Sequence, residues 1–379
     1  MIKVLFIIPN LRKGGAERLV IDICNELINR KHILVKLITF TDHNEYFSLT
    51  KNIDWQVVSA HIRLYITKKN RFSVDHLQHA INEFQPDIIH THLFEAEIVS
   101  RTCYYPSAKW FTHCHDNMIQ FENLSLKTFF NKKALTNYFE KRYLLKRYHI
   151  NGGNRFIAVS NHTKQYFEKT VKEFPVILLH NAINLSKFFN KKNNSYHIKK
   201  LRLINVGSLI NRKNQSFLID VAVLLRKKNV DFLLVLLGDG VNRAKLQKKI
   251  TENNLENFVK LMGNVDNVED YLRNSDIYVH SSFSEPFGLS IIEAMATGLP
   301  VVTIDGKGNR DLIENGKNGF ILYEQNVELF ADKIIELWSN KALYESMSHY
   351  AQEFAKKFDI KLYVHKLLQL YEDALNNKI

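Results

Sequence analysis

Short apolar segments alternate with longer amphipathic segments along the whole chain. Near-continuous apolar strands that alternate with helices are typical of parallel sheets covered on both faces. A dozen strands seldom form one open sheet. The pattern therefore predicts an α/β protein with more than one parallel sheet. The expected strands are KVLFIIP, ILVKLITF, DIIHTHL, KWFTHCH, RFIAVS, VILLHN, LRLINVG, DFLLVLLG, FVKLMG, DIYVHSS, LPVVTID and GFILY.

One polar segment interrupts this alternation. Residues 186–200, SKFFNKKNNSYHIKK, are rich in asparagine and lysine and lie between two expected strands. We therefore predict a linker over 186–200, an N-terminal domain over 1–185 and a C-terminal domain over 201–359. Three helices are expected to close the chain, the last of them within 360–379.

The composition fits a protein with ordinary apolar cores and no membrane span. Apolar residues make up 45% of the chain, and no run approaches the length of a transmembrane helix. The first ten residues are expected to form a buried strand rather than a signal peptide, because they lack a small-residue cleavage site. Few cysteines, each expected in a helix or strand, indicate reduced core thiols of a cytosolic protein. They are Cys24, Cys103 and Cys114.

The net charge of +13 is concentrated in the first half, where residues 1–190 carry about +10. Such a charge suits an anionic partner: nucleic acid, a lipid surface or a phosphorylated substrate. A lysine-rich codon bias is the alternative explanation. No RRM, KH or helix-turn-helix motif is present, so we expect no nucleic-acid partner.

Three segments that follow expected strands carry candidate ligand-binding residues, because ligands bind at the carboxyl ends of strands in open α/β sheets. Gly14 and Gly15 follow the first strand and open a helix, where a phosphate contact and a plain tight turn are equally plausible. Arg212 and Lys213 follow LRLINVG and precede a helix expected from Gln215. Two cations beside a helix N-terminus suit a diphosphate.

The third segment, SFSEPFGLSIIEAMATGLP, is the most specific. Ser284 and Pro286 suit the start of a helix, and Gly298 suits its end. We expect Phe287, Gly288 and Leu289 in the first turn, with free amides for a ligand. Glu285 is expected on the loop before the helix and Glu293 about two turns inside it, so the two carboxylates suit hydroxyls on two rings of one ligand.

These residues resemble a known family. Gly207 with Arg212 and Lys213, followed by Glu285-Pro286-Phe287-Gly288-Leu289 and Glu293-Ala294-Met295-Ala296, is similar to the Glu-x7-Glu motif of the retaining glycosyltransferases of family four. The segments Gly14-Gly15-Ala16-Glu17 and Leu179–Asn184 resemble the family's N-terminal glycine loop and interdomain linker. The resemblance spans nearly the whole chain and is loosest in its N-terminal half.

The resemblance implies two Rossmann-like domains with parallel sheets that face each other across a cleft, the glycosyltransferase-B type. The first domain would take the acceptor and the second the nucleotide-sugar donor, and helix 360–379 would cross back to the first. Arg212 and Lys213 would neutralise the donor diphosphate as it leaves, Glu293 would bind the ribose, and Glu285 would bind the donor sugar. Further donor contacts are implied for Gly14, Gly15, Gly207, Gly263, Asn264, Phe287, Gly288 and Leu289.

Four histidines end two strands of the N-terminal domain: His90 and His92 on one, His113 and His115 on the other. Period-two spacing places each pair on one face, and a zinc site is an open alternative to a polar network. Thr112-His113-Cys114-His115-Asp116 resembles the family segment whose histidine faces the donor sugar. We assign that role to His115, with His113 as the other candidate. The family commonly needs no metal or other cofactor, and the chain has no Asp-x-Asp motif.

Residues 124–150 mix aromatic and aliphatic residues with seven lysines and arginines. Basic amphipathic helices bind anionic membranes, and a helix with a solvated basic face is the alternative. The expected basic surface comprises Lys132, Lys133, Lys141, Arg142, Lys146 and Arg147. Because they cannot all face one way on a helix, some of them are expected to make no contact.

The function expected from the resemblance is retaining transfer of a hexosyl or N-acetylhexosaminyl group, with a UDP-sugar as donor and a glycan or lipid-linked glycan as acceptor. The process would be bacterial surface-polysaccharide or lipid-linked glycan assembly. The protein would be cytoplasmic, with peripheral binding to the inner face of the membrane. A nucleotide-sugar epimerase or a phosphorylase on the same fold, and remotely a nucleic-acid-binding protein, are the alternatives.

Overall fold

The computed structural model describes residues 1–65, 68–122, 131–189 and 200–379, and these form two compact units. The first unit comprises Met1–Ala182 together with Ile360–Ile379, and the second comprises Ile183–Asp359. Each unit has its own parallel sheet and its own core, as expected for a two-sheet α/β protein. Of the linker expected over 186–200, residues 190–199 lie outside the described part.

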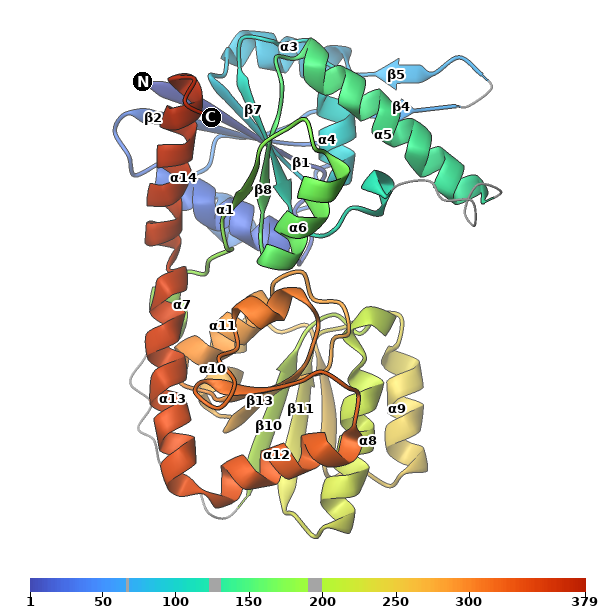
Figure 1. Cartoon of the computed structure of the whole chain (residues 1–379), viewed down its shortest axis with the longest axis vertical. Helices are drawn as coiled ribbons and strands as arrows, with labels where there is room; N and C mark the ends of the chain where they lie inside the picture. Colours follow the sequence, from blue (N-terminus) through green and yellow to red (C-terminus); the bar gives the residue numbers. More distant parts are fainter. Residues whose placement is uncertain (66–67, 123–130, 190–199) are drawn as a thin grey trace. The chain divides into compact units, whose positions relative to one another are not determined.

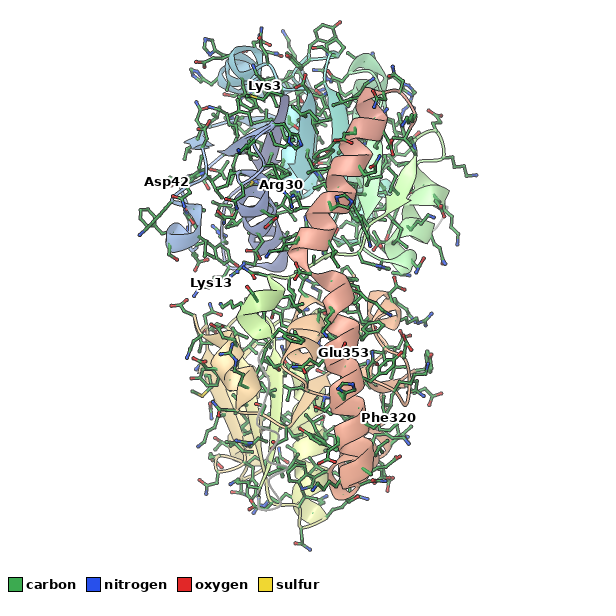
Figure 2. The ribbon with its side chains drawn as sticks, turned by 90° about the vertical axis from the view of Figure 1, so that its left-hand side faces the viewer. Lys3, Lys13, Arg30, Asp42, Phe320 and Glu353 are labelled. Atoms are coloured by element: carbon green, nitrogen blue, oxygen red, sulfur yellow. The ribbon has the colours of Figure 1, made fainter. Side chains whose placement is uncertain are left out.

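The first unit contains a seven-stranded sheet whose paired strands all run parallel, in the order β3-β2-β1-β6-β7-β8-β9. Its strands are β1 (Ile2–Ile8), β2 (Ile33–Thr39), β3 (Trp55–Val57), β6 (Ile88–His92), β7 (Lys109–Cys114), β8 (Arg155–Ala158) and β9 (Val176–Leu178). The carboxyl end of β1 leads directly to the glycine loop. Figure 2 labels Lys3 near the start of this strand and Lys13 in the loop beyond its end.

Helices cover both faces of this sheet (Figure 1). They are α1 (Gly15–Leu27), α2 (Phe47–Thr50), α3 (Asp75–Phe84), α4 (Phe94–Ser100), α5 (Lys132–Ile150), α6 (Asn161–Thr170) and α14 (Ile360–Leu375), with a 3-10 turn at Ile119–Phe121. Alternate residues of β1 enter two cores because strand side chains point to opposite faces. Phe6 packs with residues of α1 and α14, whereas Leu5 and Ile7 pack on the other side with residues of α3.

The last helix therefore completes the core of the first unit although it ends the chain. Val364 and Leu367 of α14 are buried in the same cluster as Leu19 and Ile23 of α1. Figure 1 shows the two helices side by side. Strand β3 and the antiparallel pair of β4 (His61–Arg63) and β5 (Arg71–Ser73) were not predicted from the sequence.

The second unit contains a six-stranded parallel sheet in the order β12-β11-β10-β13-β14-β15. Its strands are β10 (Leu201–Val206), β11 (Phe232–Leu237), β12 (Val259–Gly263), β13 (Ile277–His280), β14 (Val301–Ile304) and β15 (Gly319–Leu322). Its helices are α7 (Leu185–Phe188), α8 (Gln215–Lys227), α9 (Arg243–Glu252), α10 (Val268–Arg273), α11 (Leu289–Ala296), α12 (Val327–Ser339) and α13 (Lys341–Ala355), with 3-10 turns at Asn211–Lys213, Gly308–Asp311 and Lys356–Phe358.

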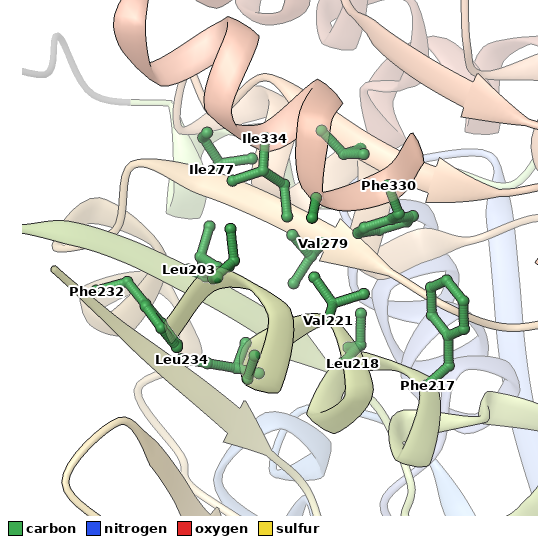
Figure 3. Packing of buried hydrophobic residues seen from close by; sticks show 14 of the residues in the cluster. Leu203, Phe217, Leu218, Val221, Phe232, Leu234, Ile277, Val279, Phe330 and Ile334 are labelled. Carbon is green, nitrogen blue, oxygen red and sulfur yellow. The ribbon is translucent and has the colours of Figure 1, made fainter. Parts of the chain in front are cut away.

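The core of the second unit lies between the sheet and helices α8 and α12. Figure 3 shows Leu218 and Val221 of α8, and Ile334 of α12, packed against Leu203 and Val279 of the two central strands. Leu218 and Val221 are three residues apart on α8, and Phe330 and Ile334 are four apart on α12, as an amphipathic face requires. The packing holds β10 and β13 in register, and the loops after these two strands carry the candidate site.

All twelve strands expected from the sequence are present, and their division into two sheets confirms the predicted fold class of two Rossmann-like domains. Among the described residues, no helix is both long and apolar enough to span a bilayer. The three cysteines are buried free thiols. Cys103 was expected in a helix or strand, but it lies in a turn after α4.

Candidate active site

The second sheet has a topological switch point between β10 and β13. From β10 the chain builds outward through β11 and β12, and it then returns to build β13, β14 and β15 on the other side. The loops after two such strands diverge and leave a ligand site at their carboxyl ends. Arg212 and Lys213 lie in the loop after β10, and Glu285 lies in the loop after β13. The fold thus brings together residues that are 72 positions apart in the sequence.

Glu285 is at the centre of this arrangement. Its side chain is buried, and its Oε2 accepts a hydrogen bond from Lys213 Nζ at 2.5 Å and one from His280 Nε2 at 3.0 Å. Burial alone would raise the pKa of Glu285. The Lys213 charge and the His280 hydrogen bond outweigh that effect, so the pKa lies far below its usual range and the carboxylate is ionised. His280 was not predicted from the sequence.

Two serines at the end of β13 hold the cationic loop in place. Ser281 Oγ donates to the carbonyl of Lys213 at 2.8 Å, and Ser282 Oγ donates to the carbonyl of Arg212 at 3.0 Å. The Arg212 side chain itself is exposed, and within the described part of the chain its hydrogen bond is to the Ser284 carbonyl, at 3.4 Å. The loop therefore presents one cation engaged with Glu285 and one that is open to an anionic ligand.

The loop after β14 supports Glu285 from behind. The Glu285 amide donates to the Gly306 carbonyl at 2.8 Å, and the Gly308 amide donates to the Glu285 carbonyl at 3.0 Å. A Cβ on Gly308 would lie 1.9 Å from the Pro286 carbonyl oxygen, so only glycine fits there. This loop, Gly306–Gly308, was also missed in the sequence analysis, although a glycine pair directly after a strand is a usable signal for a close backbone approach.

The helix after Glu285 starts later than predicted. It begins at Leu289, so Phe287 and Gly288 precede it instead of forming its first turn. Gly288 is the N-cap, and its φ of 109° is a conformation that favours glycine. The helix therefore starts after Gly288 and not at the Ser-Pro segment expected from the sequence. The Phe287 ring is buried against Phe358, with ring centroids 5.8 Å apart, so only its backbone can meet a ligand.

Glu293 lies in the second turn of α11 and is closer to the helix start than predicted. Its side chain is half-buried.

The other predicted donor residues lie at strand ends. Gly207 follows β10 directly, and its amide donates to the Leu237 carbonyl at 2.9 Å. Gly263 ends β12, the edge strand, and Asn264 is exposed beyond it. All these predicted donor residues thus lie at the carboxyl ends of strands of one sheet or at the adjoining helix start.

The first sheet has its own switch point, between β1 and β6. Gly14 is the N-cap of α1, and Tyr46 Oη bonds both its amide, at 3.0 Å, and its carbonyl, at 3.1 Å. Gly15 is the first residue of α1, so its amide has no acceptor within the helix. Gly15 is exposed, whereas the Gly14 amide is already taken by Tyr46.

The four histidines form one stack at the ends of β6 and β7. The rings of His92 and His113 are 4.8 Å apart and those of His113 and His115 are 4.4 Å apart, with interplanar angles of 20° and 16°. His92 Nδ1 lies 2.9 Å from His115 Nε2, and His90 Nδ1 lies 2.6 Å from Tyr371 Oη of α14. Only His115 retains exposed surface, because the other three are fully buried. Burial lowers the pKa of all four.

The stack offers nitrogens but not a convergent metal site. One nitrogen from each of His90, His92 and His113 lies within 4.8 Å of the others. An imidazole binds a metal through a lone pair in the plane of its ring. The planes here lie within 28° of parallel, so their lone pairs lie in separate, nearly parallel planes and do not meet at one point. Zinc would require some of these buried rings to turn out of the stack.

Two protein-family models match adjoining parts of the chain. The one described as Glycosyltransferase Family 4 matches residues 13–187, and the one described as Glycosyl transferases group 1 matches residues 186–354. The boundary between the two matches falls close to the boundary between the two structural units.

Named relatives include an uncharacterized glycosyltransferase of Haemophilus influenzae, 25% identical over 95% of this chain and 97% of the relative. The poly(ribitol-phosphate) α-N-acetylglucosaminyltransferase of Staphylococcus aureus is 30% identical over 60% of this chain and 46% of its own. A UDP-Gal:α-D-GlcNAc-diphosphoundecaprenol α-1,3-galactosyltransferase of Escherichia coli is 27% identical over 59% and 61%. This chain therefore spans less than two thirds of the last two relatives.

Among solved structures, Anabaena HepE in complex with UDP and glucose superposes with a TM-score of 0.78 over 98% of this chain and 100% of that one, at 21% identity. This likeness concerns the fold and agrees with the two-sheet architecture. Together with the two family matches and the named relatives, it establishes that the chain is a glycosyltransferase of family four with the glycosyltransferase-B fold.

Proposed function

We propose that the protein transfers a sugar, with retention of anomeric configuration, from a UDP-sugar to a hydroxyl of a cell-surface or lipid-linked glycan. The observation that carries this proposal is the buried, ionised Glu285 beside Lys213 and Arg212 at the switch point of the second sheet. In such a site a carboxylate suits sugar hydroxyls, and two cations suit the diphosphate. The second unit is then the donor unit and the first the acceptor unit.

Catalysis here depends on charge. As the bond to the sugar breaks, negative charge grows on the leaving phosphate, and a cation already held in place stabilises it without reorganisation. Lys213 is held by the ion pair of its side chain with Glu285 and by the hydrogen bond that its carbonyl accepts from Ser281. The free amides at the start of α11 add positive potential at the same edge. No protein carboxylate is assigned as a covalent nucleophile.

We assign His115 to the transferred sugar, because it alone among the stacked histidines keeps exposed surface. Its Nε2 is engaged by His92 Nδ1, which leaves Nδ1 for a ligand.

We also propose that transfer needs no metal, which the near-parallel histidine rings and the lack of an Asp-x-Asp motif support. Full activity in EDTA is the expected result, and chelator inactivation reversed by zinc would overturn it.

The acceptor assignment takes its support from the relatives, whose acceptors are a polyol phosphate polymer and a diphosphoundecaprenol-linked sugar. Both are anionic, as the basic first unit would favour. On α5, the residues Phe139, Arg142, Lys146 and Ile150 are all exposed and recur at three- and four-residue spacing along one stripe. We propose that this stripe binds an anionic membrane from the cytoplasmic side.

The function is tested by presenting UDP-, GDP- and ADP-sugars in a thermal-shift assay, then the preferred donor with an acceptor. A ligand at a hundredfold excess over its Kd stabilises the folded state by about 2.7 kcal/mol. We expect a UDP-sugar to give the largest shift, and NMR of the product to show the anomeric configuration of the donor. A larger shift with a GDP- or ADP-sugar, or an inverted product, would contradict the corresponding part of the proposal.

A further inference from the structure

The two oxygens of the Glu285 carboxylate differ in their hydrogen bonding. Both hydrogen bonds that it accepts fall on Oε2, one from Lys213 and one from His280. Among the described residues, Oε1 has no hydrogen-bond partner. A carboxylate held on one oxygen is fixed in rotation, and its second oxygen remains free to accept a bond in a defined direction.

We propose that His280 is a positioning residue that fixes Glu285 so that Oε1 faces the donor sugar. This inference rests on the proposed role of Glu285 in binding that sugar. His280 is the last residue of β13, so the central strand of the sheet sets its position. Its ring is 1% exposed and cannot reach a ligand itself, which separates it from residues that touch the donor.

The surroundings of His280 determine which ring nitrogen carries the hydrogen. Nε2 faces a carboxylate and therefore carries the hydrogen, whereas Nδ1 is buried and has no hydrogen-bond partner in the part of the chain that the structure describes. A second proton on Nδ1 would be a buried donor without an acceptor, so the neutral tautomer is favoured. Lys213 and Arg212 from the loop before α8 disfavour a positive charge on the ring, Glu285 favours one, and Tyr278 of the same strand stacks on the ring at 6.1 Å.

The arrangement also explains why Glu285 needs a second donor besides Lys213. A diphosphate attracts Lys213, and any turn of that side chain toward the phosphate weakens its bond to Glu285. His280 cannot follow, because it is fixed in the strand. It therefore keeps the buried carboxylate partnered while Lys213 acts on the leaving group, and Glu285 stays ionised and in place.

The test compares two polar substitutions of almost equal chemistry. In His280→Gln the amide nitrogen occupies nearly the place of Nε2 and can donate to Oε2, whereas in His280→Asn the shorter amide cannot reach it. We expect His280→Asn to lower kcat about 10-fold or more with UDP affinity changed less than about twofold. His280→Gln should recover most of kcat.

The split between kcat and UDP affinity is a signal that a merely structural role would not give. A general loosening of the site would lower UDP affinity together with kcat, and His280→Gln would not reverse it. Equal kcat in the two variants, or a parallel loss of UDP affinity, would overturn the inference.

A third variant separates this inference from the proposed function. Glu285→Gln should lose most transfer activity. If it transfers at the rate of the unsubstituted protein, the donor role of Glu285 is wrong. If Glu285→Gln is inactive and His280→Asn is fully active, only the role of His280 is wrong. Thermal unfolding of each variant shows that it is folded, and Tyr278→Phe serves as a control that changes the neighbouring ring without touching the carboxylate.

Discussion

At the scale of single residues, the two cations before α8 differ in their surroundings although they are adjacent in sequence. Lys213 is bonded to a buried carboxylate, and Arg212 is exposed. We expect either Arg212→Ala or Lys213→Ala to lower kcat/KM about 100-fold or more, because each removes a preorganised charge from the leaving group. Steady-state kinetics measure this. Lys228→Ala, at the far end of the same helix, is the control and should have normal kinetics.

Substitutions of Glu285 and Glu293 should have different effects on UDP binding. The ribose contact expected for Glu293 does not depend on the sugar, so we predict that Glu293→Gln weakens binding of UDP itself, by about tenfold for one lost hydrogen bond to a charged group. Glu285→Gln should leave UDP binding nearly unchanged and impair turnover. Calorimetry with UDP alone checks both variants. The opposite pattern would mean that the two roles are exchanged.

The roles of site residues could be predicted where the residues belong to a sequence motif. They could not be predicted where the residues meet only because of the fold. The cations and the two glutamates follow from their types and spacing, and the fold brings Lys213 and Glu285 into contact. His280 ends β13, and the residues between it and Glu285 are irregular, so no periodicity indicates that the two side chains meet. Ser281, Ser282 and Gly308 act through backbone groups, which leave little trace in side-chain patterns.

At the scale of secondary-structure elements, α5 combines a basic stripe with an inward face, and the structure corrects part of the predicted basic surface. Lys141 is buried, and its Nζ donates to the Phe121 carbonyl at 2.9 Å. Arg147 is half-buried and bonds the Thr102 carbonyl. These two residues anchor the helix rather than join the surface. The remaining exposed cations are Lys132, Lys133, Arg142 and Lys146. Residues 124–130 of the predicted segment lie outside the described part.

We expect the protein to sediment with anionic liposomes at low salt and to detach between about 0.1 and 0.5 M salt, since each well-placed cation contributes about 1 kcal/mol and screening removes it. Replacing the four exposed cations of α5 by alanine should abolish sedimentation. Replacing four exposed lysines of the second unit (Lys227, Lys228, Lys245 and Lys248) should not. Equal sedimentation with neutral liposomes, or none at low salt, would show that the stripe is only a solvated face.

Elements were predictable in proportion to their length and hydrophobicity. Every expected apolar strand is present, because a strand buried on both faces needs an apolar run whatever its partners. The missed β3, β4 and β5 have three residues each, too few for any period to emerge. The start of α11 was misplaced because Ser-Pro is a good local start, whereas the loop after β14 bonds the Glu285 backbone and holds that segment outside the helix.

At the scale of the whole molecule, stability should depend on the histidine stack, which joins β6, β7 and α14 within the first unit. His90 bonds Tyr371 of the last helix, and His113 Nε2 lies 3.1 Å from Asn181 Oδ1 near the end of the first continuous segment. The stack therefore connects the two chain segments that make up this unit. Burial lowers the pKa of His113 to about 4 and lowers those of its neighbours as well.

The sign of the pH dependence follows from these shifts. Above the ordinary histidine pKa of about 6.5 the rings are neutral in both folded and unfolded chains, and the stack has no pH-dependent effect. Below it, the unfolded chain binds protons that the folded stack excludes. The free energy of unfolding should then fall by up to about 1.4 kcal/mol per pH unit for each excluded proton, until the pH reaches the lowered folded pKa.

Tryptophan fluorescence can follow this in the first unit alone. Trp55 and Trp110 belong to that unit, and the third tryptophan, Trp338, belongs to the other. In a Trp338→Phe background, we expect the denaturant midpoint to fall between pH 7 and pH 5. His90→Phe removes one titrating ring and should make that fall shallower, even though the lost Tyr371 bond lowers stability at every pH. His79→Ala alters an exposed histidine outside the stack and should keep the full slope. An identical slope in all three proteins would contradict this prediction, because it would mean that His90 binds protons equally in the folded and unfolded chains.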